Sequence, residues 1–161
     1  MKKLLLAVAA ITISAASVNA QDKEMKTGGT TFSIAGNIGH ATTPTYFNLV
    51  AGGDIQVDIP ATTGLKITVS GGYESFSWKI DSSKGHSGYI PLLAGAKFNL
   101  STNLYGHAQL GYSIFTGIGG GGLFTYAPSL GYMFSKNFDA SVKYLGLNHV
   151  GGIVARLAYN F

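Results

Sequence analysis

The segment Asp81-Ser82-Ser83-Lys84-Gly85-His86-Ser87 contains the residue types of an acyl-transfer site: a hydroxyl nucleophile, a histidine base and an acid. Such chemistry needs a serine activated by the base, and an acid that orients the base. Spacing along the chain does not orient these groups, and Asp, Ser, Lys and Gly are also typical of a solvated loop tip. We therefore expect a surface loop, no enzyme and no catalytic residue.

A glycine run from Gly117 to Gly122 formally satisfies the G-x-G-x-x-G pattern of dinucleotide-binding sites. That site requires a helix after the run, whereas the residues after Gly122 alternate like a strand, so we expect a loop. The four histidines lack the spacing of metal ligands, and the chain contains no cysteine. No metal, no cofactor and no cofactor-binding site are expected.

The end of the chain alternates strictly between two faces. Phe161, Tyr159 and Leu157 share one face of an extended strand, while Asn160 and Arg156 lie on the other. A strand that closes a barrel in lipid can end on aromatic residues, because these favour the interface between membrane and water. This pattern indicates an outer-membrane barrel.

The N-terminus predicts export. Met1-Lys2-Lys3 is basic, Leu4 to about Ser17 is apolar, and Val18-Asn19-Ala20 ends with small residues where signal peptidase cuts. We expect residues 1–20 to be a cleaved signal peptide and residues 21–161 to be a single barrel domain. The net charge of +4 falls by two when Lys2 and Lys3 leave, and no basic cluster remains to suggest a nucleic-acid partner.

Segments of about ten residues with alternating character repeat along the rest of the chain, as the tilted strands of a membrane barrel require. They predict an all-β fold, an eight-stranded antiparallel up-and-down transmembrane barrel, with the longest loop at Ser77–Gly88. The outward face of the second strand is expected to include Phe47. A soluble lipocalin-type barrel, with its apolar residues inside, is the rival fold. The predicted strands are Thr30–Gly39, Tyr46–Ile59, Leu65–Phe76, Tyr89–Leu100, Leu104–Phe115, Leu123–Phe134, Phe138–Leu147 and Gly151–Phe161.

The opposite faces of these strands carry charges of both signs. Eight strands leave an interior just wide enough for side chains to fill, and an unpaired charge is costly to bury there. Four acids facing four bases therefore favour a plug of paired polar side chains, with a narrow porin-like channel as the alternative. The interior charges are expected to be Asp54, Asp58, Glu74, Asp139, Lys66, Lys97, Lys143 and Arg156.

Aromatic residues flank the longest predicted loop. Phe76, Trp78 and Tyr89 could anchor a partner at the surface. Trp78 could equally lie in the belt of aromatic residues at the membrane interface, which is the interpretation we favour.

Three runs, Ile90–Lys97, Ala127–Tyr132 and Leu157–Phe161, resemble those of small OmpA/OmpX-like outer-membrane barrels. The resemblance is strongest to the outer membrane protein beta-barrel domain family of Bacteroidetes-type bacteria, and it covers nearly the whole mature chain. It implies a Gram-negative outer-membrane location, export by the Sec route and insertion by the barrel assembly machinery through the last strand. Leu157, Tyr159 and Phe161 would then form the C-terminal assembly signal.

We therefore expect a monomer in contact with outer-membrane lipids and lipopolysaccharide, with a structural or surface-interaction role. Acyltransferases and deacylases that modify lipid A also use eight-stranded barrels. That enzyme class is the weaker alternative, because fold does not imply function and no catalytic motif supports it.

Overall fold

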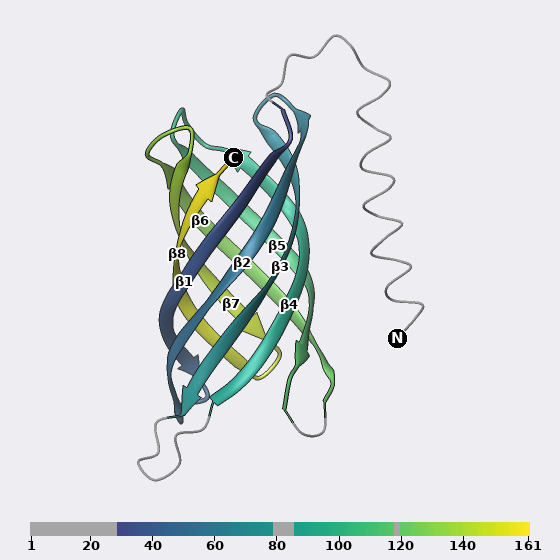
Figure 1. Cartoon of the computed structure of the whole chain (residues 1–161), viewed down its shortest axis with the longest axis vertical. Helices are drawn as coiled ribbons and strands as arrows, with labels where there is room; N and C mark the ends of the chain where they lie inside the picture. The colour runs from purple at the N-terminus through teal and green to yellow at the C-terminus, as the bar shows by residue number, and fades with distance from the viewer. Residues whose placement is uncertain (1–28, 79–85, 118–119) are drawn as a thin grey trace.

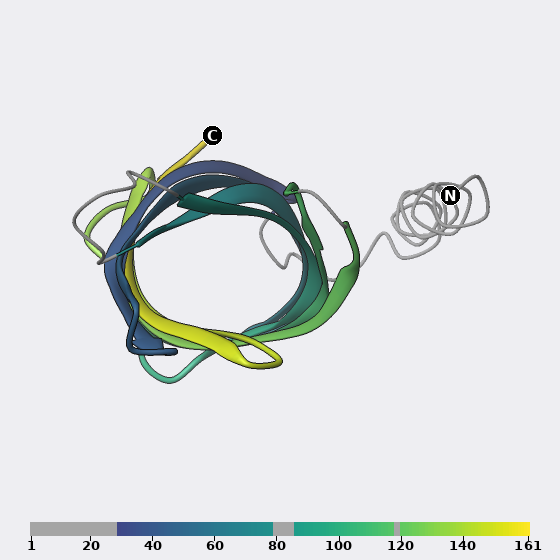
Figure 2. The ribbon, with the colours of Figure 1, turned by 90° about the horizontal axis from the view of Figure 1, so that it is seen from below.

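The computed structural model describes residues 29–78, 86–117 and 120–161. In this part of the chain, eight antiparallel strands pair in sequential order and close into a barrel through the pairing of β1 with β8 (Figures 1 and 2). This confirms the predicted fold class. The strands are β1 (Thr31–Thr43), β2 (Phe47–Thr62), β3 (Leu65–Trp78), β4 (His86–Asn99), β5 (Leu104–Phe115), β6 (Gly122–Met133), β7 (Phe138–Leu147) and β8 (Val150–Asn160).

The expected signal peptide and residues Asp81 to Gly85 of the expected loop lie outside the described residues. Among the residues that are described, no helix is long and apolar enough to cross a membrane.

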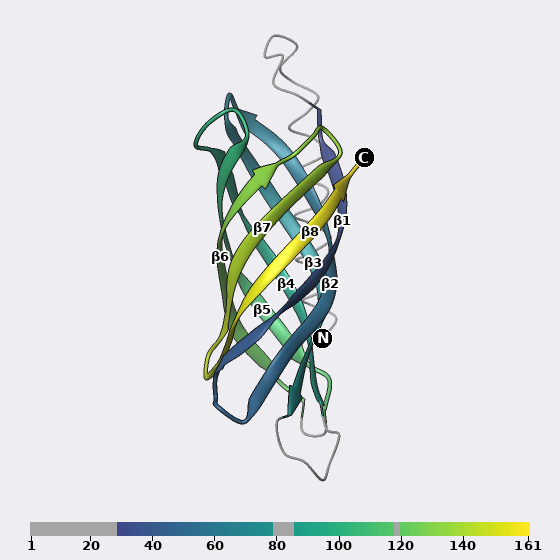
Figure 3. The ribbon, with the colours of Figure 1, turned by 90° about the vertical axis from the view of Figure 1, so that its left-hand side faces the viewer.

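The two ends of the barrel differ. At the turn end, β1 begins beside the end of β8, since Ser33 pairs with Asn160, and the β2–β3, β4–β5 and β6–β7 connections lie there (Figures 1 and 3). The other four connections lie at the opposite end, here called the loop end. The longest separation in sequence between consecutive strands is that between the end of β3 at Trp78 and the start of β4 at His86, and it is called the longest connection below.

Several strands extend further toward the loop end than predicted. β1 continues to Thr43, although the prediction ended it at Gly39, because Ala41 still pairs with Gly152 of β8. β4 begins at His86 instead of Tyr89, since His86 pairs with Ser77 of β3. Polar residues and glycines interrupt the alternation at these positions, so the pattern ends before the pairing does.

The outer surface of the barrel is apolar along its middle and carries aromatic residues toward both ends. Large aliphatic side chains such as Ile38, Leu110 and Val142 lie exposed along its middle. Aromatic side chains are favoured where a membrane meets water, so this face has the character of a surface that meets lipid. The exposed aromatics include Phe98, Phe134, Phe138, Tyr159 and Phe161 toward the turn end and Tyr46, Trp78, Tyr112 and Phe124 toward the loop end.

Closing the sheet brings strand backbones close together at glycines whose missing side chain would point inward. A Cβ at Gly39 of β1 would overlap the carbonyl oxygen of Ile153 on β8, whereas a Cβ at Gly36 of the same strand would meet open space. Gly39 is therefore needed for the approach of the two strands that close the barrel.

We expect Gly39→Ala to lower the free energy of unfolding by ~1–3 kcal/mol, because the added methyl group must displace a strand backbone. Gly36→Ala is the matched control and should change stability by less than ~0.5 kcal/mol. Urea unfolding of the refolded mature protein in detergent micelles, followed by circular dichroism, measures both. Equal effects of the two substitutions would contradict the pairing of β1 with β8.

Candidate functional site

The interior of the barrel is filled by two layers of different chemistry. The layer nearer the loop end is apolar, which corrects the expectation of a wholly polar plug. Val50, Phe76, Leu147 and Val154 are completely inaccessible to solvent. This layer consists of Ala41, Phe47, Val50, Phe76, Tyr89, Leu93, Ala127, Leu145, Leu147 and Val154, with Phe115, Leu123 and Val150 packed against it.

A row of aromatic rings crosses the apolar layer from β2 to β5. The ring centroids are 5.6 Å apart between Phe47 and Phe76, 5.4 Å between Phe76 and Tyr89, and 5.3 Å between Tyr89 and Phe115. Tilted and edge-to-face pairs at such distances are favourable beyond the area they bury. The row therefore fills one side of the loop end of the interior with packed rings, and the buried hydroxyls of Ser113 and Thr125, hydrogen-bonded to each other at 2.7 Å, lie at the same level.

Two predictions about these aromatics were wrong. Phe47 was expected to face outward, but a register shift between Phe47 and Val50 reverses the alternation, so Phe47 is buried and Asn48 is exposed. Phe76 and Tyr89 were considered as exposed anchors for a partner, yet both are buried in the apolar layer. Trp78, by contrast, is half exposed at the loop end.

The layer nearer the turn end is polar, and Arg156 of β8 lies at its centre. Its guanidinium donates to Asp54 on β2 from Nη2 to Oδ1 at 2.9 Å and from Nε to Oδ2 at 3.2 Å, a bidentate contact, which is the strong kind of ion pair. Its Nη1 lies 3.7 Å from Asp139 Oδ1. Asp139 also accepts hydrogen bonds from the Tyr105 hydroxyl at 2.6 Å and the Asn160 amide at 2.8 Å.

Two lysines complete the polar layer. Lys143 of β7 donates to Glu74 at 3.1 Å and to Asp54 at 3.5 Å. Lys97 of β4 lies 3.3 Å from Asp58, and its Nζ is 4.0 Å from the centroid of the Tyr105 ring. The charged side chains of these ion pairs are all less than a tenth exposed. A buried charge of this kind is tolerated only when it is paired and hydrogen-bonded.

The structure brings together seven of the eight charges expected inside the barrel. Lys66 is the exception. It is the second residue of β3, at the turn end, where it is only half buried and its Nζ lies 3.5 Å from the Thr31 hydroxyl. Within the described ranges, Lys66 makes no ion pair. Alternation assigns a residue to a face of the sheet but not to a height along the barrel, which is why the prediction included Lys66. The network therefore contains four acids and three bases instead of the expected four and four.

Tyr105 is a member of the polar layer that the sequence reasoning missed. It is almost fully buried, donates to Asp139 and lies beneath Lys97. Its alternation with His107 and Gln109 on β5 was the available signal. His107 itself lies inside, 2.8 Å from the Thr68 hydroxyl.

The only described part of the serine- and histidine-containing loop segment is His86 and Ser87. They are consecutive in β4 and lie on opposite faces: His86 is exposed, while Ser87 is buried and accepts a hydrogen bond from Trp78 Nε1 at 3.3 Å. This alternation separates the two side chains. No group of three or more His, Cys, Asp or Glu side chains suited to a metal ion occurs in the part of the chain that the structure describes.

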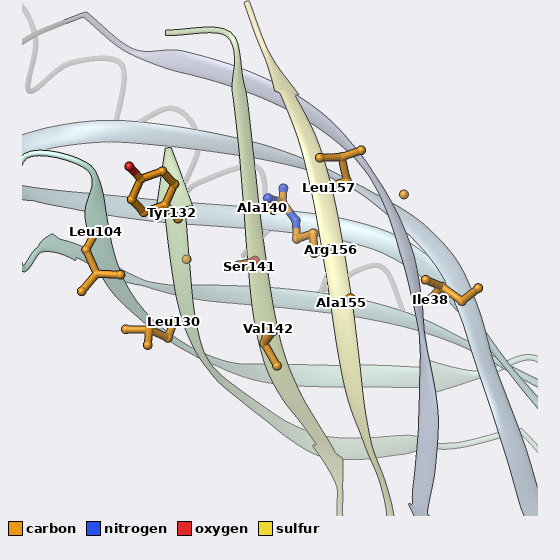
Figure 4. A pocket seen from close by; sticks show the side chains of 12 residues that line it. Ile38, Leu104, Leu130, Tyr132, Ala140, Ser141, Val142, Ala155, Arg156 and Leu157 are labelled. Atoms are coloured by element: carbon orange, nitrogen blue, oxygen red, sulfur yellow. The ribbon is translucent and has the colours of Figure 1, made fainter. Parts of the chain in front are cut away.

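A groove of about 440 Å³ lies on the outer wall of the barrel (Figure 4). Its floor includes the small residues Ala140 and Ala155, and larger side chains such as Ile38, Leu130 and Leu157 surround them. Arg156 borders the same groove, but its side chain belongs to the interior network. The groove is thus lined mainly by hydrocarbon.

We expect Arg156→Gln to lower the free energy of unfolding by ~3–5 kcal/mol, because it leaves Asp54 and Asp139 buried without their guanidinium partner. Lys66→Gln, which removes an interior-facing lysine outside the network, should cost less than ~1 kcal/mol. Urea titrations of both variants in the same detergent test this difference. Similar losses would contradict the central position of Arg156.

No family model and no curated protein sequence matches this chain. Among solved structures, it is similar to Ail, the attachment invasion locus protein of Yersinia pestis, at 19% identity and a TM-score of 0.56, covering 82% of this chain and 97% of that chain. It is also similar to the N-terminal barrel domain of Pseudomonas aeruginosa OprF, at 20% identity and a TM-score of 0.53, covering 83% of this chain and 99% of that chain. A de novo designed transmembrane barrel matches with 17% identity and a TM-score of 0.59, covering 85% of this chain and 100% of that one.

These similar proteins give no support to the Bacteroidetes-type part of the resemblance. The similarity is one of architecture: the chain has the fold of eight-stranded transmembrane β-barrels.

Proposed function

We propose that this chain is a small integral protein of the Gram-negative outer membrane with a closed interior and a structural or surface-interaction role. The proposal includes export with cleavage of residues 1–20, insertion as a monomer, and contact of the apolar outer wall with outer-membrane lipids and lipopolysaccharide. The observation that carries it is the filling of the interior by two successive layers, one of hydrocarbon and one of paired charges.

Both layers oppose conduction. A permeating ion would lose its water in the apolar layer, where Val50, Phe76 and Leu147 are fully buried and supply no polar group in exchange. It would then have to displace Arg156 or Lys143 from their carboxylates in the polar layer. Neither layer leaves the continuous polar pathway that a porin needs, so the porin-like alternative is disfavoured.

The loop end is the surface that this proposal assigns to interaction. Tyr46 and Trp78 are each 45% exposed there, with ring centroids 5.6 Å apart. Such amphipathic rings suit the headgroup region of the outer leaflet or a partner that approaches it. Trp78 is also the last residue of β3.

In planar bilayers, the refolded mature protein should show no steady openings. Phe76→Ala and Arg156→Gln, each of which weakens only one layer, should also remain closed because the other layer persists. Single-channel recordings of the three proteins measure this directly. Large, steady and ion-selective openings of the unsubstituted protein would overturn the closed interior and favour the porin-like alternative.

Lipid A composition distinguishes the proposed non-enzymatic role from the enzyme alternative. For a non-enzymatic protein, mass spectrometry of lipid A from cells with and without the protein should show the same acyl chains. A change in acyl chains that disappears with His86→Ala would contradict the non-enzymatic role.

The last strand should carry the assembly signal. Leu157, Tyr159 and Phe161 all lie on the outer face, and Phe161 is 75% exposed. Deleting Phe161 together with Tyr159→Ala should lower the amount of barrel in the outer membrane and leave periplasmic material for proteases. Phe134→Ala, which removes an exposed aromatic at the same end but outside β8, is the control. Unchanged assembly of the β8 variant would contradict this role.

A further inference from the structure

Two buried acceptor atoms lie unpaired at the boundary between the apolar and polar layers. They are Asn37 Oδ1 and Glu74 Oε2, and neither has a hydrogen-bond partner in the described part of the chain. Yet the same two side chains already share a hydrogen bond, from Asn37 Nδ2 to Glu74 Oε1 at 2.6 Å. An unpaired buried acceptor is costly, so two in one pair need an explanation.

A glycine allows these two side chains to meet. Gly52 of β2 pairs with Asn37 of β1 on one side and with Glu74 of β3 on the other. A Cβ at Gly52 would overlap Glu74 Oε2. The amide and the carboxyl group therefore approach each other across the space that a side chain would fill, and Oε2 packs against the β2 backbone, away from water.

The charges of the polar layer do not balance if every carboxyl group is ionised. Lys66 lies outside this layer, so only three cations, Lys97, Lys143 and Arg156, face its four carboxyl groups. Glu74 and Asp139 each depend on one cation that is shared with Asp54. Both oxygens of Asp139 accept hydrogen bonds, from Tyr105 and Asn160, whereas Glu74 Oε2 accepts none from the described residues, so Glu74 is the least compensated of the four. Arg156 makes its bidentate contact with Asp54, so no second cation compensates Glu74.

The other neighbours of Glu74 supply no positive charge. On β4 it pairs with Tyr89, a member of the apolar layer, and the next inward residue on its own strand is the fully buried Phe76. Glu74 itself is completely inaccessible to solvent. An ionised carboxylate in this position is unfavourable, because Oε2 is buried and no donor of the described residues reaches it.

We propose that Glu74 is a proton-binding site: at neutral pH its Oε2 carries a proton and donates a hydrogen bond to Asn37 Oδ1. The acid and the amide then form a ring of two hydrogen bonds, with Asn37 donating to Oε1 and Glu74 donating to Oδ1. One proton satisfies both unpaired acceptors and removes the excess negative charge. The boundary between the two layers is thereby a neutral pair that separates the ionised network from the hydrocarbon.

Infrared difference spectroscopy of the folded mature protein in detergent tests this proposal. At neutral pH the protein should show the carbonyl band of a protonated carboxylic acid, which shifts in heavy water. Glu74→Gln should abolish the band, and Asp58→Asn, which removes a carboxylate that pairs with Lys97 and not with the cation of Glu74, should leave it. Absence of the band, or its persistence in Glu74→Gln, would overturn the proposal.

Stability supplies a second readout. In Glu74→Gln, the new amide can donate to Asn37 Oδ1. The urea midpoint of this variant should therefore equal or exceed that of the unsubstituted protein, whereas Asp54→Asn should clearly lower the midpoint. If Glu74→Gln loses as much as Asp54→Asn, Glu74 is ionised and the proposal is wrong. Should Glu74→Gln not refold, Asn37→Leu tests the same pair, because it should move the carboxylic acid band to higher frequency. An unmoved band would exclude the hydrogen bond to Asn37.

Discussion

The pairing of β1 with β8 is the constraint on which the rest of this structure depends. It removes both free edges of the sheet and encloses an interior that eight strands leave just wide enough for side chains. Inward residues that are buried must therefore be satisfied mainly by other inward residues. Apolar side chains meet this demand by packing, as in the aromatic row, and charged side chains meet it by pairing, as around Arg156.

Apart from Arg156–Asp139, which joins the neighbouring strands β8 and β7, the ion pairs of the polar layer connect strands that are not neighbours in the sheet. Arg156 on β8 reaches Asp54 on β2, Lys143 on β7 reaches Glu74 on β3, and Lys97 on β4 reaches Asp58 on β2. Backbone hydrogen bonds link each strand only to the next one around the barrel. The side-chain network adds contacts across the lumen, so it stabilises the barrel against flattening and fills the pathway that an ion would need.

If the interior is closed, as we propose, the function of the protein depends on its surface. The outer wall is apolar and suits lipid, and the short connections of the turn end offer little area. The loop end combines the exposed rings of Tyr46 and Trp78 with the longest connection, and it lies directly above the apolar layer. A ligand bound there would rest on a rigid, dry support, which is the usual arrangement of a binding loop on a scaffold. The fold itself does not name that ligand.

The number of strands, their antiparallel order and, for most residues, the face they occupy could be predicted from the amino-acid pattern. The reason is that side chains alternate with a period of two, and this period is visible in residues such as Leu157, Tyr159 and Phe161. The tertiary structure alone decided the heights at which inward residues meet, because these depend on strand tilt and on the stagger that closure imposes. It separated Lys66 from the network, turned Phe47 inward at a bulge, and brought Asn37 and Glu74 together across Gly52.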